Sequence, residues 1–131
     1  VVFTGDILFI EGTPIMWAGP VSNWLGACDA IIELGARTIV PGHGPVTDES
    51  GVRDVQRYLT YIRDEATERF EAGMDEHAAA DDIDIGDFRD WGDPERIAVN
   101  VATIYRELDP SLAAITPPEL FVRMAQWSAR H

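Results

Sequence analysis

The chain has 131 residues, which is enough for one compact domain or for one half of a larger one. Its 10 Lys and Arg residues against 23 Asp and Glu residues give a formal net charge of −13, which argues against binding to nucleic acid or to an anionic membrane surface. A hydrophobic content of 46% and a charged content of 25% are typical of globular chains, and no apolar run is long enough to predict a membrane span.

The first ten residues are expected to form a β-strand. Val1–Ile10 is rich in β-branched and aromatic residues, and only Gly5 and Asp6 interrupt it. The chain starts directly in this strand, with no methionine and no signal peptide, so we expect that upstream sequence has been removed. The single Cys28 cannot form an internal disulfide, which favours a cytoplasmic location.

A loop, a helix and a second strand are expected next. The segment Glu11–Pro20 contains two glycines and two prolines, which predicts a loop. Ser22 is a candidate N-cap for a helix over Asn23–Leu34, and the apolar stripe of that helix includes Cys28, which we expect to be a small buried hydrophobe rather than a nucleophile. The short run Thr38–Val40 predicts a buried strand.

The remainder of the chain is expected to be helical. The predicted helices extend from an N-cap among Thr47, Asp48 and Ser50 to about Ala72, and then cover Met74–Ile83, Glu95–Leu108 and Glu119–Ala129. We therefore expect an α/β fold in which residues 1–72 form two strand–loop–helix units and residues 73–131 form a helical tail packed on them. Two strands are too few for a sheet, so its remainder must come from missing sequence or from a second copy.

Two side chains are candidates for chemistry. Asp6 lies in an apolar run, where an ionised carboxylate needs a cation, a metal or hydrogen-bond donors, the alternative being an aspartate that caps a turn. His43 lies between glycines and prolines in Pro41–Pro45, a segment expected to leave the second strand abruptly. This setting suits a metal ligand or a catalytic base, the alternative being a histidine in an ordinary tight turn.

The segments around these two residues resemble a known family. Phe3–Asp6 and Val40–Gly44, with a helix between them, are similar to the last two metal-binding motifs of the metallo-β-lactamase superfamily. The loop at Gly12–Pro14 and the helix start at Asn23–Trp24 resemble its glyoxalase-II-like branch of metallo-hydrolases. The resemblance covers residues 1–72 and implies the C-terminal half of an αββα metallo-β-lactamase-type sandwich, followed by a helical tail.

The resemblance also implies a dinuclear metal centre. Asp6 would bridge two metal ions and His43 would bind the second, with zinc as the expected metal and iron or manganese as alternatives. Such a pair lowers the pKa of a bridging water, and the resulting hydroxide attacks an ester, a thioester or a related small substrate. Trp17 and Asn23 would lie near this metal face and bind substrate, the alternative being packing in the core or the loop.

The sequence departs from the family pattern in one major respect. The signature His-x-His-x-Asp-His is absent, and the other two histidines are the terminal His131 and His77, which is expected on an exposed, acidic helix. The resemblance therefore implies an enzyme only for a parent protein. This chain would hold two ligands of a site completed by the missing N-terminal half of the domain, and it is expected to be inactive alone.

A non-catalytic role is the alternative. The chain could be an oligomerisation or binding module that retains Asp6 and His43 as remnants of a metal site, and its open sheet would favour a homodimer. The sequence does not identify the substrate, because specificity in such folds depends on loops and pockets.

Overall fold

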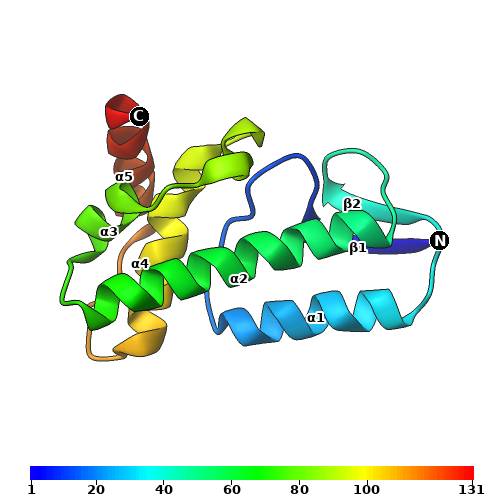
Figure 1. Ribbon diagram of the computed structural model, residues 1–131, viewed down its shortest axis with the longest axis horizontal. Coiled ribbons are helices and arrows are strands. Elements are labelled where there is room, and N and C mark those ends of the chain that lie inside the picture. Colours follow the sequence, from blue (N-terminus) through cyan, green and yellow to red (C-terminus); the bar gives the residue numbers. More distant parts are fainter.

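The computed structural model, which describes residues 1–131, contains a small parallel sheet at one end and a set of helices at the other (Figure 1). The sheet consists of β1 (Val2–Phe9) and β2 (Ile39–His43), and the helix α1 (Val21–Glu33) connects them. Parallel strands need such a crossover, so this segment is a β–α–β unit. The predicted α/β class is confirmed.

The second strand is longer than predicted. It was expected to end at Val40, but β2 continues through Pro41 and Gly42 and pairs with β1 as far as His43. Proline lacks a backbone N–H and is tolerated because β2 is an edge strand. Gly42 is needed for close approach, since a Cβ there would lie 2.5 Å from the carbonyl group of Gly5.

The long helix α2 (Glu49–Glu71) runs from the sheet to the helical tail (Figure 1). Of the three candidate N-caps, Asp48 is the one used, and its side chain accepts a hydrogen bond from the backbone N–H of Ser50. One apolar stripe of α2 packs against the core: Val52, Val55, Leu59, Ile62 and Ala66 are buried and Phe70 is partly buried. Helices α1 and α2 pack against each other and against β1.

Three α-helices and two short 3₁₀ helices follow: α3 (Glu76–Asp82), η1 (Gly86–Asp90), η2 (Pro94–Arg96), α4 (Ile97–Leu108) and α5 (Pro117–Arg130). The segment between the predicted helices Met74–Ile83 and Glu95–Leu108 therefore contains η1, and η2 overlaps the predicted start of the second of these helices. Helix α4 is the centre of this region, because it packs against α2, α3 and α5. A core of 27 buried residues connects the tail with the β–α–β unit.

The start of α1 depends on a distant residue. The prediction that Ser22 caps this helix is wrong, because the helix begins one residue earlier, at Val21, and no side chain of the preceding residue caps it. Instead, the backbone N–H of Val21 donates a 3.1 Å hydrogen bond to Oε2 of Glu107 on α4. An acidic group suits the N-terminal end of a helix.

Apolar side chains remain exposed on the sheet. Side chains along a strand alternate between its faces, and Thr4 is buried whereas the neighbouring Phe3 is 77% exposed. The sheet face that carries Phe3 is therefore open near the start of β1, whereas Leu8 and Phe9 at the end of β1 are both buried. None of the helices combines the length and the apolar character that crossing a bilayer requires.

Candidate functional site

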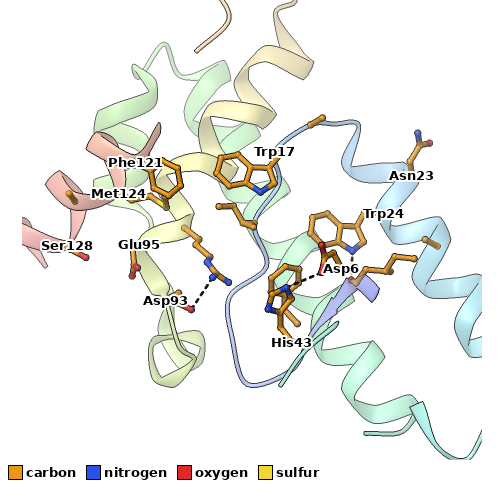
Figure 2. A pocket seen from close by; sticks show the side chains of 17 residues that line it. Asp6, Trp17, Asn23, Trp24, His43, Asp93, Glu95, Phe121, Met124 and Ser128 are labelled. Atoms are coloured by element: carbon orange, nitrogen blue, oxygen red, sulfur yellow. Dashed lines mark hydrogen bonds and ion pairs between the residues drawn. The ribbon is translucent and has the colours of Figure 1, made fainter. Parts of the chain in front are cut away.

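Asp6 on β1 and His43 at the end of β2 lie side by side (Figure 2). The Nε2 atom of His43 is 3.1 Å from Oδ1 of Asp6, which is within hydrogen-bond distance. The Asp6 side chain is 85% exposed and that of His43 is 52% exposed. The Asp6 carboxylate is therefore hydrated, and its contact with His43 is not needed to offset burial in an apolar strand.

Phe9 contacts the imidazole of His43, and Ile10 holds its backbone. The ring of Phe9 stacks on it, with 4.3 Å between the ring centroids and 7° between the ring planes. The carbonyl oxygen of His43 accepts a 2.9 Å hydrogen bond from the backbone N–H of Ile10. Gly44 has a φ of +92°, and a Cβ at this position would lie only 2.0 Å from the carbonyl oxygen of Ile10. The absence of a side chain at Gly44 therefore allows the end of β2 to approach the backbone of Ile10.

The fully buried Asn100 of α4 holds the loop that precedes α1. Its Oδ1 atom accepts a 2.7 Å hydrogen bond from the backbone N–H of Met16, and its Nδ2 atom donates 2.9 Å hydrogen bonds to Pro14 and to the hydroxyl of Tyr58. The hydroxyl of Thr103 donates a 2.6 Å hydrogen bond to the carbonyl of Met16. Both backbone groups of the residue before Trp17 are thus bound to α4.

Three further contacts hold the segments around the two candidate residues. The indole Nε1 of Trp24 on α1 donates a 2.7 Å hydrogen bond to the carbonyl of Ile7, the residue after Asp6. Arg96 donates a 2.8 Å hydrogen bond to the carbonyl of Thr13 and forms a 3.2 Å ion pair with Asp93. These contacts bind the end of β1 to α1 and the loop to η2.

All four sequence-predicted site residues line one cavity of about 930 Å³ (Figure 2). Its lining consists of Asp6, Ile7, Phe9, Ile15, Trp17, Ala18, Asn23, Trp24, Ala27, His43, Asp93, Glu95, Arg96, Phe121, Met124, Ala125 and Ser128. The structure thus brings Trp17 and Asn23 to the same cavity as Asp6 and His43. A cavity of this size with a few clustered polar groups is typical of a small-molecule site.

Sequence reasoning missed the contribution of the tail to this cavity. Arg96 comes from η2, and Phe121 and Met124 come from α5. One signal was available in the sequence. The buried stripe of α5 includes Leu120, Met124 and Trp127, so Phe121 is a large apolar residue outside the stripe of its helix.

The other residues that could supply metal ligands or a nucleophile do not join the site. His77 is exposed on α3, and the chain contains no group of three or more His, Cys, Asp or Glu residues that could hold a metal ion. Cys28 is fully buried in α1, as predicted, and burial together with the nearby charge of Asp29 raises the pKa of its thiol to about 11. Such a thiol is a poor nucleophile at neutral pH.

Comparison with known proteins does not assign the chain to a family. No protein-family model matches the chain, and a search of the curated proteins finds no significant match.

Proposed function

We propose that the chain is the C-terminal part of a dinuclear, zinc-dependent hydrolase that acts on an ester, a thioester or a related small substrate. In this proposal the chain forms the second half of a metallo-β-lactamase-type αββα sandwich, and Asp6 and His43 would be the residues of this chain that hold the metal ions. The observation that supports it is the 3.1 Å approach of His43 Nε2 to Asp6 Oδ1 on the wall of the cavity.

The two donor atoms suit a shared zinc ion. Two ligands at about 2.0 Å from a tetrahedral zinc ion are about 3.3 Å apart, and the observed 3.1 Å between the Asp6 and His43 atoms is close to this separation. Both side chains are open to a further ligand. A catalytic zinc ion usually has three protein ligands, so the proposal requires additional ligands from residues outside this chain.

The open sheet face supports a half-domain. Phe3 on β1 is 77% exposed, Val1 just before β1 is 79% exposed, and Val46 shortly after β2 is 61% exposed. A two-stranded sheet rarely stands alone, and exposed apolar groups on one face favour association. The first sheet of the sandwich would cover this face.

The residues of the chain would have distinct roles in this enzyme. Phe9 orients the imidazole of His43, and Trp24 fixes the strand next to Asp6. Trp17 and Asn23 contribute to the wall that faces the substrate. Bound metal ions would supply a water of lowered pKa as the nucleophile.

Metal content tests the proposal. The 131-residue chain is expected to bind zinc weakly and substoichiometrically, whereas a longer chain with its upstream half should hold two zinc ions and hydrolyse 4-nitrophenyl acetate. Asp6→Asn and His43→Gln in the longer chain should each lower the zinc content and the rate by at least about tenfold. His77→Gln, which changes an exposed histidine on α3, is the matched control and should change neither. Full activity in the His43→Gln variant would contradict the proposal.

The open sheet face also favours a second candidate, a non-catalytic homodimeric module in which another copy covers Phe3. The molecular mass of the longer chain in solution, measured together with its zinc content, distinguishes the hydrolase from the homodimeric module. A stable dimer of the longer chain without bound zinc and without hydrolysis would support the module.

A further inference from the structure

We infer that the cavity takes an uncharged substrate and binds an aromatic or bulky apolar group of it between Trp17 and Phe121. The position of the reacting carbonyl, next to Asp6 and His43, depends on the proposed function. The binding of the apolar group does not depend on it.

Trp17 and Phe121 form an exposed aromatic pair inside the cavity wall (Figure 2). Their ring centroids are 6.0 Å apart and the planes are inclined by 55°, so the two rings form an angled surface rather than a closed stack. Trp17 is 51% exposed and Phe121 is 58% exposed, although the fold has a large core that could bury such side chains. An aromatic ligand group would remove this apolar surface from water.

The rest of the lining points to the same ligand class. Ten of the 17 lining residues are hydrophobic, and the charged ones are Asp6, Asp93, Glu95 and Arg96. Three carboxylates therefore face one guanidinium. In the metal-free chain Arg96 is already engaged by Asp93 and by the carbonyl of Thr13, so its guanidinium is not free to bind a carboxylate or phosphate group of a ligand. This charge balance disfavours anions and favours an uncharged substrate.

The backbone that carries the two rings is held in place by the fold. Trp17 follows Met16, whose N–H and carbonyl are both bound to α4. Phe121 belongs to α5, and this helix is attached to α3 by a 3.0 Å hydrogen bond from the indole of Trp127 to the carbonyl of Ala80. A binding surface that is already ordered loses little conformational entropy when it binds a ligand. The cavity of about 930 Å³ leaves room for a two-ring group and a linker to the Asp6 end.

A pair of matched probes tests this inference without relying on activity. 1-Naphthaleneacetamide and 1-naphthaleneacetate carry the same ring system, but only the second is an anion. Titration calorimetry with the metal-free 131-residue chain should show that the amide binds at least about tenfold more tightly than the anion. Glu95→Gln should reduce the ratio of the two affinities, because it removes one carboxylate from the lining of the cavity. Equal affinity for both probes, or tighter binding of the anion, would overturn the inference.

Single substitutions locate the probe. Trp17→Ala and Phe121→Ala should each weaken binding of the amide by about tenfold, because each removes part of the aromatic surface. Both side chains are more than half exposed, so neither change is expected to unfold the chain. Val122→Ala is the matched control, since Val122 is 55% exposed on the same helix but does not line the cavity. Unchanged binding in both aromatic variants would refute the inference.

The same experiment separates this inference from the proposed function. Trp17→Ala and Phe121→Ala should weaken binding of the amide in the metal-free 131-residue chain, in which no hydrolysis is expected, so this readout does not depend on the proposed function. If the amide binds at Trp17 and Phe121 but the zinc-loaded longer chain does not hydrolyse esters, only the proposed function fails. If the longer chain is active but Trp17→Ala and Phe121→Ala leave its rate on aromatic esters unchanged, only this inference fails.

Discussion

The ring of Phe9 lies parallel to the imidazole of His43, with 4.3 Å between the ring centroids. Phe9 is only 4% exposed, so its position is set by the core. Its ring in turn supports the imidazole of His43, a side chain that is 52% exposed. The stack fixes the plane of the imidazole, and in this plane Nε2 faces Asp6. An aromatic core residue thus acts as a positioning residue for the candidate metal ligand.

Phe9→Leu should therefore weaken zinc binding without unfolding the chain. Leucine retains most of the buried apolar volume but removes the flat surface under the imidazole, so we expect about a tenfold loss of zinc affinity in the longer chain. Competition with a chromophoric zinc chelator measures this change. Phe70→Leu, which alters an aromatic contact with Tyr105 in the tail, is the control and should leave zinc affinity unchanged. An equal loss in both variants would show that Phe9 has no specific role.

Gly44→Ala should disrupt the His43 segment. Alanine disfavours the observed φ of +92°, and its Cβ would lie 2.0 Å from the carbonyl oxygen of Ile10, so the chain must move. We expect a loss of at least about 2 kcal/mol in the free energy of unfolding, measured by urea titration. Gly26→Ala is the control, because Gly26 lies in α1 and a Cβ there would have no atom within 4 Å. It should be neutral or stabilising by up to about 1 kcal/mol.

The local sequence was sufficient for some elements and misleading for others. The N-cap Asp48 and the apolar stripe predicted α2, because both signals are local to the helix. The continuation of β2 to His43 was missed, because proline and glycine usually end a strand, whereas here Pro41 lies on a sheet edge and Gly42 allows close approach to β1. Whether a residue lies on an edge is a property of the assembled sheet.

The candidate site was likewise predictable from the sequence only where its residues are marked by their sequence neighbours. Asp6 and His43 could be selected from their neighbours in sequence, and the structure places them 3.1 Å apart. The contributions of Arg96 and Phe121 to the cavity, and the capping of α1 by Glu107, come from the tail and depend on how the helices pack. No periodicity or spacing within one segment encodes such contacts.

Asn100→Ala should destabilise the fold and release the Trp17 loop. The substitution leaves the N–H of Met16, the carbonyl of Pro14 and the buried hydroxyl of Tyr58 without this partner. Burial already raises the pKa of the Tyr58 hydroxyl well above its usual range, which shows how little water reaches this position. We expect a loss of about 3 kcal/mol in the free energy of unfolding.

Urea unfolding measures that loss, and the fluorescence of Trp17 should change with the order of the loop. Asn23→Ala is the control, because Asn23 is exposed on α1 and should change stability by no more than about 0.5 kcal/mol. A similarly small effect of Asn100→Ala would mean that the loop is held by other contacts.

Glu76 should make the attachment of α5 dependent on pH. Its carboxylate pairs with Arg106 of α4 and Arg123 of α5 and is only 14% exposed. Burial acts to raise the pKa of Glu76, but hydrogen bonds and attraction from the two arginines outweigh this effect, so the pKa lies below its ordinary value of 4.5. A lowered pKa in the folded state means that the stabilisation is complete above about pH 4.5 and is lost as the pH falls through the folded-state pKa.

Glu76→Gln removes the charge at similar size, and we expect it to cost about 2 kcal/mol of unfolding free energy at pH 7. The difference from the unmodified chain should shrink as the pH falls below 4.5 and vanish once Glu76 is protonated in both states. Urea titrations between pH 7 and pH 3 measure this convergence. Glu71→Gln, at the exposed end of α2, is the control and should track the unmodified chain at every pH. A difference for Glu76→Gln that is independent of pH would show that the ion pairs contribute nothing and that the substitution acts only through packing.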